Sequence, residues 1–201
     1  MTVHIAPASA TEIEECAHLI ALALRDDPVL KAFVPGERDR ANRLTVFFCD
    51  ALREGAFLTG VVDVARREPG GDIIGVAAWE GPGQRQRLRD LFGEFSRQVR
   101  ASGINHAPNL LAQLVAYARA RPRYPHWYLA DIAVDGAARG LGIGSALLTH
   151  RLAEIDAQAA PAYLEATAPD NQRLYERFGF RSAGPIGKGS VTAVAMIRSP
   201  Q

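Results

Sequence analysis

Residues 126 to 158 constrain the fold of this chain more than any other stretch. They open with HWYLADIAV, an aromatic and aliphatic run typical of a strand, which ends before the turn dipeptide Asp135-Gly136. They close with a helix signal, in which one stripe recurs at steps of four and three: Leu141, Ser145, Leu148, Leu152 and Ile155. Glycines at 140, 142 and 144 lie between the two. A strand, a glycine-rich turn and a helix N-terminus present unpaired N–H groups and the positive end of a helix dipole, so this stretch predicts an anion-binding site.

The spacing of these glycines decides between phosphate-binding motifs. The dinucleotide fingerprint G-x-G-x-x-G would need glycine at 140, 142 and 145, and residue 145 is serine. The P-loop pattern G-x-x-x-x-G-K-[ST] does not occur at this site. The segment RGLGIG, residues 139–144, instead resembles the Gln/Arg-x-x-Gly-x-Gly/Ala motif with which the GNAT superfamily of N-acetyltransferases binds acyl-CoA. The alternative is a glycine-rich turn that binds no ligand.

A second motif follows in the order that the superfamily shows. Residues 171–180, NQRLYERFGF, resemble the N-x-x-L-Y-E-x-x-G-F signature at the end of the GNAT core. Two separated motifs in the right order are more specific than either alone. The resemblance is closest over residues 126–185, and within the superfamily it looks most like the puromycin N-acetyltransferase branch.

This resemblance implies an α/β fold with a mixed central sheet of about six to seven strands, flanked by helices. A V-shaped splay would separate two central parallel strands, in a single acetyltransferase domain over 1–201 with its acyl-CoA-binding core at about 126–185. Residues 84–121 exceed a minimal core and predict a helical insertion, in which His106 is either a substrate contact or a solvated loop histidine. The patterns predict strands at 3–7, 57–66, 72–79, 126–134, 162–167, 180–183 and 190–197, and further helices at about 12–24, 39–54 and 168–177.

Composition excludes several classes of function. A formal net charge of +1 in 201 residues gives no electrostatic reason to expect nucleic acid, a membrane surface or a strongly charged partner. There is no apolar run of about 18 residues that would indicate a membrane span, and no signal-peptide pattern at the N-terminus. Cys16 and Cys49, the two cysteines, fall in apolar helical patterns without metal or redox spacing, so we expect buried thiols and a cytoplasmic protein. A homodimer is possible, because late strands often pair in this superfamily.

The resemblance also implies how acetyl-CoA, the acyl donor, would bind. It would lie between the strands at 127–134 and 162–167, with its pantetheine amides on the backbone of Ile132, Ala133 and Val134. Its pyrophosphate would meet the backbone N–H groups of Arg139, Gly140, Leu141, Gly142, Ile143, Gly144 and Ser145. Asn171 would bind the cofactor or a strand, although Ala168 stands where many members carry another asparagine. Direct acyl transfer needs no metal, and we expect none.

Three side chains are candidates for the chemistry. Tyr175 matches the family tyrosine near the thioester sulfur, and a phenol is protonated at neutral pH and can serve as a general acid. Asp131 and Glu165 lie in apolar strands that flank the cleft, where burying a carboxylate is costly unless it has a partner or a function. Either could deprotonate an ammonium, and the resemblance favours Glu165. By strand alternation, Asp131 would share a face with Trp127 and Leu129. A structural role remains open for all three.

The acceptor side is less constrained. In GNAT proteins the first helices overhang the acceptor cleft, so Asp27 and Phe33 are candidate substrate contacts, as is Trp79 on the third strand; capping and core packing are the alternatives. The function that follows is transfer of an acetyl group from acetyl-CoA to the primary amine of a small molecule, by direct attack in a ternary complex. A non-catalytic acyl-CoA sensor is the alternative, and a nucleotide-binding oxidoreductase is disfavoured by Ser145.

Overall fold

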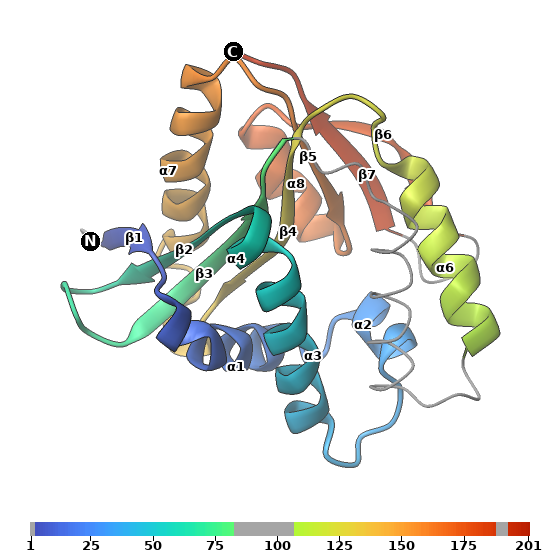
Figure 1. The fold of residues 1–201 in the computed structure, drawn as a ribbon, viewed down its shortest axis with the longest axis horizontal. Coiled ribbons are helices and arrows are strands. Elements are labelled where there is room, and N and C mark those ends of the chain that lie inside the picture. Colours follow the sequence, from blue (N-terminus) through green and yellow to red (C-terminus); the bar gives the residue numbers. More distant parts are fainter. Residues whose placement is uncertain (1–2, 83–106, 188–192) are drawn as a thin grey trace.

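The computed structural model describes residues 3–82, 107–187 and 193–201, and its centre is a seven-stranded sheet in the order β1-β2-β3-β4-β5-β7-β6 (Figure 1). The strands are β1 (His4–Pro7), β2 (Gly60–Arg66), β3 (Ile73–Glu80), β4 (Trp127–Val134), β5 (Ala162–Ala166), β6 (Arg181–Ile186) and β7 (Ala193–Arg198). β4 and β5 run parallel, and the other neighbouring strands run antiparallel. This confirms the predicted α/β class and mixed sheet. Within the described ranges, no helix has both the length and the apolar character needed to cross a membrane.

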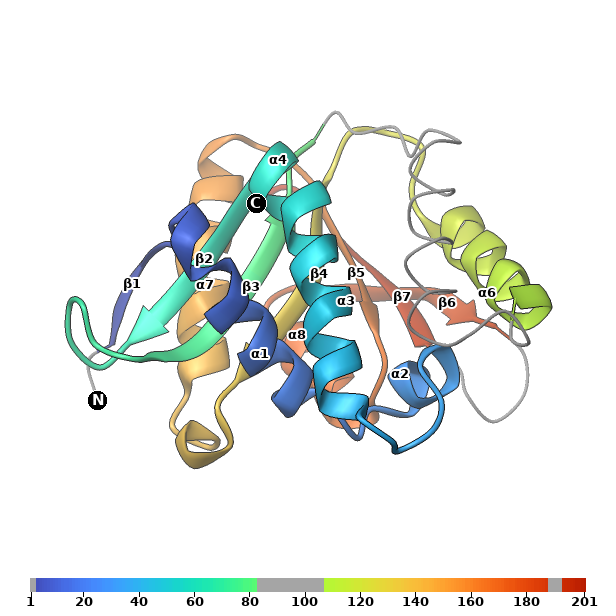
Figure 2. The same cartoon turned by 60° about the horizontal axis from the view of Figure 1, so that its bottom comes forward.

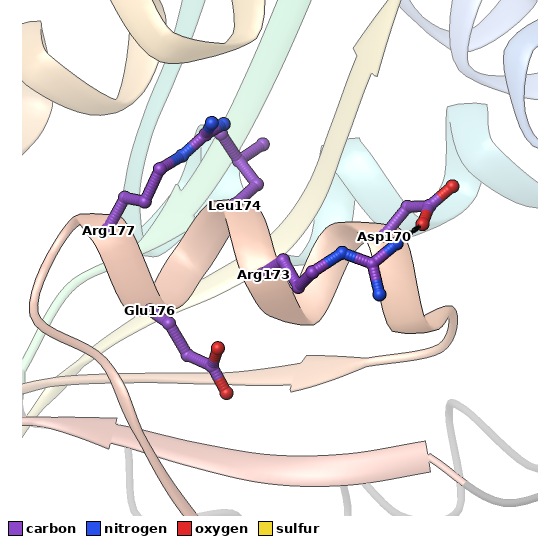
Figure 3. Close-up of a pocket in the computed structure, with 5 residues that line it drawn as sticks. All are labelled: Asp170, Arg173, Leu174, Glu176 and Arg177. Atoms are coloured by element: carbon purple, nitrogen blue, oxygen red, sulfur yellow. Dashed lines mark hydrogen bonds and ion pairs between the residues drawn. The ribbon is translucent and has the colours of Figure 1, made fainter.

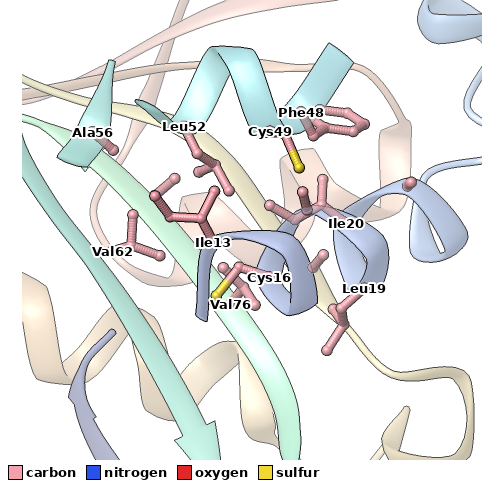
Figure 4. Close-up of a cluster of buried hydrophobic side chains, with 14 of the residues drawn as sticks. Ile13, Cys16, Leu19, Ile20, Phe48, Cys49, Leu52, Ala56, Val62 and Val76 are labelled. Carbon is pink, nitrogen blue, oxygen red and sulfur yellow. The ribbon is translucent and has the colours of Figure 1, made fainter. Parts of the chain in front are cut away.

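One face of the sheet is covered by α1 (Ile13–Ala23) and α3 (Arg40–Glu54), which lie side by side in both views (Figures 1 and 2). The chain enters α1 through a short 3-10 helix, Ala10–Glu12, whose capping box joins Ser9 and Glu12. Between the two long helices, α2 (Pro28–Phe33) begins with proline in its first turn. The two cysteines are buried free thiols. The core between these helices and the sheet includes Ile13, Cys16, Ile20, Phe48, Leu52, Val62 and Val76 (Figure 4).

The other face carries α7 (Ile143–Ala157) and α8 (Pro169–Arg177), with a short 3-10 helix, Gly136–Ala138, ahead of α7. Their core joins side chains from both helices and from the sheet, among them Trp79, Leu129, Leu147, Leu152, Leu164, Tyr175 and Phe180. Arg151 of α7 crosses this layer to make two hydrogen bonds, of 2.8 and 2.6 Å, with the fully buried carboxylate of Asp63 on β2. Gly179, at φ +86°, ends α8 in the left-handed conformation that the sequence predicts there.

Three predicted boundaries were wrong. Residues 56–59 form a helical turn, α4 (Ala56–Thr59), and β2 starts at Gly60, where an added Cβ would lie 2.0 Å from the Trp79 carbonyl oxygen. α7 starts at Ile143, so Leu141 stands outside the helix and is 47% exposed. β6 occupies 181–186 rather than 180–183. The predicted start of the last strand, residues 190–192, lies outside the described residues, and β7 is described over 193–198. In the predicted insertion, α6 (Ala107–Ala120) confirms the second helix, while residues 84–106, and His106 with them, lie outside the described residues.

The parallel strands β4 and β5 separate like a fork. Only three residue pairs join them, the last being Leu129 with Leu164, although β4 continues to Val134. At the same point the β3–β4 register shifts, because Trp79 pairs with Leu129 whereas Ala78 pairs with Asp131. This bulge adds one residue to β4 and changes which side chains share a face.

The bulge corrects the predicted orientation of Asp131. Leu129 packs in the core against α7. Ala78, which pairs with Asp131, and Ala133, two residues after it on β4, pack in the core against α1 and α3. Asp131 therefore lies on the face opposite Leu129, not on the same face as simple alternation predicts. The splay between the two central strands, by contrast, is as the sequence predicts.

Candidate active site

The fork leaves one edge of β4 without a strand partner. Ile132, Ala133 and Val134 pair with β3 on their other side and lie beyond the last β4–β5 pair. Backbone amides and carbonyls on the β5 side of this segment can therefore pair with the amides of an extended ligand. The structure places these three residues at the open end of the fork.

The glycine loop after β4 forms an open helix N-terminus. Gly140 and Gly142 have φ values of +76° and +79°, which favour glycine, and a Cβ added to either would meet no atom within 4 Å. The first helical hydrogen bond of α7 runs from the Ala146 N–H to the Gly142 carbonyl. In the part of the chain that the structure describes, the N–H groups of residues 140–145 donate to no acceptor. The loop can therefore hold an anion with several backbone donors at once.

The side chains around this loop have separate roles. Arg139 is exposed and donates from its guanidinium to the Ala23 carbonyl at the end of α1, over 2.9 Å. Ile143 is buried in the core, so any ligand contact from it is through its N–H group. Gly144 and Ser145 complete the first turn of α7. Asn171 lies half-buried in the first turn of α8.

Tyr175, on α8, is buried against the sheet near Asp131 and Asp27. The residue is 5% exposed, and its ring meets Phe180 edge-to-face at 6.1 Å between centroids. Burial raises the pKa of its hydroxyl, and the negative charges of Asp131 and Asp27 raise that pKa further. The phenol therefore stays protonated at neutral pH and lies near two carboxylates.

Asp131 has an unusual electrostatic setting for an aspartate. It is partly exposed, and burial of its carboxyl raises the pKa to about 7, with further contributions from the charges of Glu80 and Glu165. The three acids come from β4, β3 and β5, which are neighbours in the sheet. A carboxyl with a pKa near neutrality can both take up and release a proton under ordinary conditions.

Glu165 is more enclosed than Asp131. Its side chain is 6% exposed and lies 3.9 Å from the guanidinium of Arg121, the residue that follows α6. Burial raises its pKa, whereas Arg121 and the hydroxyls of Tyr128 and Tyr163 oppose the rise. The guanidinium also stands 3.8 Å above the centre of the Tyr128 ring. Glu165 therefore has a cationic neighbour inside the protein.

The remaining predicted contacts fall into three cases. Asp27 caps α2 by accepting from the Val29 and Leu30 N–H groups at 2.8 and 3.0 Å, and its other oxygen accepts from the Thr167 hydroxyl at 2.6 Å. This carboxylate thus joins α2 to the end of β5. Trp79 is fully buried in the core against α7, which is the packing role weighed as its alternative. The Phe33 side chain lies outside what the structure describes.

Comparison with known proteins now decides the family. The sequence model of the acetyltransferase (GNAT) family matches residues 25–180. The chain belongs to the GNAT family. A crystal structure described as histone acetyltransferase HPA2 and related acetyltransferase, from Corynebacterium glutamicum, is 30% identical to it, covering 100% of this chain and 98% of the other with a TM-score of 0.78. The chain is thus an acyltransferase of this family, as its two motifs indicate.

Other GNAT relatives are more distant. An uncharacterized N-acetyltransferase of Schizosaccharomyces pombe is 27% identical over 119 residues, and the match spans 55% of this chain but only 48%, about half, of that relative. An agmatine N-acetyltransferase is 13% identical with a TM-score of 0.67 and covers 98% of this chain and 99% of its own, which shows a common fold.

Sequence reasoning did not identify four residues that lie near Asp131 and Glu165: Glu80, Arg121, Tyr128 and Tyr163. Glu80 and Tyr128 pair directly across β3 and β4, and Tyr128 pairs in turn with Tyr163 on β5. Strand alternation could have placed the two tyrosines on one face, but it does not predict that Arg121 contacts Tyr128 from the end of α6.

A surface hollow lies away from these groups, along the outer side of α8 (Figure 3). It is lined by Asp170, Arg173, Leu174, Glu176 and Arg177, and Arg173 pairs with Asp170 there. Tyr175 belongs to the same helix but is buried in the core. We therefore place the chemistry at the fork and not in this hollow.

Proposed function

We propose that this GNAT protein transfers an acetyl group from acetyl-CoA to the primary amine of a small molecule by direct attack in a ternary complex. One arrangement carries the proposal. The open α7 N-terminus leads along the unpaired edge of β4 to a buried tyrosine with carboxylates beside it. In this proposal the acyl donor binds along β4, Tyr175 is the acid and a nearby carboxylate is the base.

The donor half rests on backbone groups. Free N–H groups of residues 140–145 suit a pyrophosphate, which carries its charge on oxygens that need several donors. The unpaired edge of Ile132 to Val134 suits the two amides of pantetheine. Neither contact depends on a particular side chain, which fits the exposed or core positions of Arg139, Leu141 and Ile143.

The acceptor half rests on Asp131 and Tyr175. In the proposed reaction the amine nitrogen attacks the thioester carbonyl carbon, and Asp131 takes the proton that the amine loses, directly or through one water. The carbon–sulfur bond then breaks, and the leaving thiolate takes the proton of the Tyr175 hydroxyl. The raised pKa of Tyr175 keeps that proton in place at neutral pH.

The proposal takes Asp131 rather than Glu165 as the base. Asp131 is partly exposed at the fork and its pKa is about 7, close to the pH at which the enzyme would work. Glu165 is enclosed, and Arg121 lies against it. We therefore assign the proton transfer to Asp131, although the sequence alone favours Glu165.

Calorimetry with acetyl-CoA, followed by a thiol-release assay with primary amines, tests the proposal. We expect acetyl-CoA to bind and NADH not to bind. Gly142→Asp should weaken binding at least tenfold, because it places a negative charge at the open helix N-terminus. Gly70→Asp is a matched control: Gly70 has φ +77° and equally open surroundings, but it lies in the β2–β3 turn.

Two results would count against the proposal. If the wild type does not bind acetyl-CoA, or if both glycine variants bind equally well, the assignment of the glycine loop is wrong. If acetyl-CoA binds but no amine is turned over, and Tyr175→Phe binds it unchanged, the protein is the acyl-CoA sensor instead. Catalysis predicts a loss of kcat of about 100-fold or more in Tyr175→Phe at unchanged acetyl-CoA affinity.

A further inference from the structure

A cluster of aromatic and acidic side chains, which the proposal below treats as a pocket, lies at the base of the fork, beside the proposed amine position. Tyr128 and Tyr163 face each other across β4 and β5, with ring centroids 5.9 Å apart. Glu165 follows on the same face of β5, two residues beyond Tyr163. His126 closes one side, with its ring 5.6 Å from that of Tyr163. Aromatic faces and a carboxylate together suit a cation.

A cation already stands in this pocket. The Arg121 guanidinium lies 3.8 Å above the Tyr128 ring centre and 3.9 Å from Glu165 Oε1, and its side chain is 17% exposed. It reaches the pocket from the end of α6, outside the strands that build the fork. At 3.9 Å the ion pair with Glu165 is too long for a hydrogen bond.

The pocket keeps polar atoms that this cation does not satisfy. Tyr163 is fully buried, and its hydroxyl lies near enough to the Glu165 carboxylate to lower the pKa of that group, yet it makes no hydrogen bond of ordinary geometry with any residue that the structure describes. Glu165 Oε1 likewise makes no such hydrogen bond within the described residues. Buried polar atoms normally have partners, so a hydroxyl and a carboxylate oxygen left open in one pocket point to a ligand that donates hydrogen bonds.

We propose that Tyr128, Tyr163 and Glu165 form a binding site for a second cationic group of the acceptor, and that Arg121 occupies this site until the acceptor displaces it. The acceptor class is then a diamine, or an amine with another cationic end, rather than a simple monoamine. This proposal rests on the proposed acetyltransferase function and names the substrate class of that site.

The strand register sets the length of such an acceptor. Asp131 pairs with Ala78 and Tyr128 pairs with Glu80, so the bulge leaves the two positions only two residues apart along β3. Two residues of strand span roughly 7 Å. The reacting nitrogen at Asp131 and the second cation at Tyr128 therefore fit the ends of a diamine of about putrescine or cadaverine length.

Three amines of equal chain length test the inference: cadaverine, n-pentylamine and 5-aminopentanoate end in a cation, a methyl group and a carboxylate. We expect the KM of cadaverine to be about tenfold or more below that of pentylamine, with 5-aminopentanoate poorest. Glu165→Gln and Tyr163→Phe should each reduce this preference at unchanged acetyl-CoA affinity. Arg121→Gln should lower the KM of cadaverine several-fold and leave that of pentylamine nearly unchanged.

Arg119→Gln is the matched control, since it removes the same charge from an exposed position two residues earlier and should change neither KM. Equal KM values for cadaverine and pentylamine would overturn the inference while leaving the acetyltransferase function intact. A preference for 5-aminopentanoate that Arg121→Gln abolishes would also overturn it, because Arg121 would then bind a carboxylate. If no amine is turned over, calorimetry compares the affinities of cadaverine and pentylamine directly, and equal affinities overturn the proposed binding site for a second cation.

Discussion

Asp131→Asn should make this protein more stable at alkaline pH while it abolishes most activity. The carboxyl of Asp131 has its pKa raised to about 7 from an ordinary value of 3.8, chiefly by burial and then by Glu80 and Glu165. A raised carboxyl pKa means that the folded protein binds a proton that the unfolded chain has released. The stability associated with Asp131 is therefore complete below pH 4 and is lost as the pH rises to about 7.

The size of this loss follows from the shift. The difference of about 3 units between 3.8 and about 7, at 1.36 kcal/mol per unit, gives roughly 4 kcal/mol over the whole window. About two of these units lie between pH 5 and pH 7, so roughly 3 kcal/mol is the upper bound for that interval. Because the residue is partly exposed, water at the fork screens the charge, and we expect about 1–2 kcal/mol to remain.

Urea unfolding of the wild type and Asp131→Asn at pH 5 and pH 8 measures this difference. The variant should gain about 1–2 kcal/mol on the wild type between the two pH values, whereas Asp72→Asn, at an exposed position of the β2–β3 turn, should gain nothing. The wild-type kcat/KM should rise through an apparent pKa near 7, and the variant should lack this rise. An Asp131→Asn protein that is equally destabilised at both pH values would refute the reasoning, because Asp131 would then be a structural hydrogen-bonding residue.

Two further predictions concern the scaffold that holds the site. Arg151→Met should lower the free energy of unfolding, measured in urea, by about 3–5 kcal/mol, because it leaves the buried Asp63 carboxylate without its partner. The control Glu154→Gln removes a half-exposed contact of the same arginine and should change the free energy of unfolding by under about 1 kcal/mol. Gly75→Ala should weaken acetyl-CoA binding several-fold in calorimetry, because its Cβ would lie 2.7 Å from the Ile143 side chain at the start of α7; unchanged affinity would show that the helix terminus tolerates the displacement.

The loop conformation of the proposed donor site could be predicted because its requirements are local. The turn before the N-terminus of α7 contains residues with positive φ, and the glycines at 140 and 142 indicate this conformation directly in the sequence. Tyr175 could be located for a similar reason, since it sits in a short motif whose helix ends at Gly179. Each of these features depends on neighbours within a few residues along the chain.

The acceptor half depends on contacts that no local pattern records. Alternation assumes a regular pleat, and the single extra residue in β4 moved Asp131 to the opposite face and beside Glu165. Arg121 reaches Tyr128 from a helix that the sequence could predict only as an insertion. The resemblance favours Glu165 as the base, whereas the contact between Glu165 and Arg121 becomes visible only once three separate segments are assembled.

This division between the two halves has a consequence for specificity. In the proposed function, backbone N–H groups and the free edge of β4 hold the donor, so side-chain changes around the fork need not alter acetyl-CoA binding. The proposed acceptor, in contrast, would meet side chains from three strands together with Arg121, which belongs to none of them. Glu80, Asp131 and Glu165 also repel one another, so the fork is most stable with positive charge in it. A change at Arg121 can therefore redirect the choice of amine while the donor site and the Tyr175–Asp131 pair stay as they are.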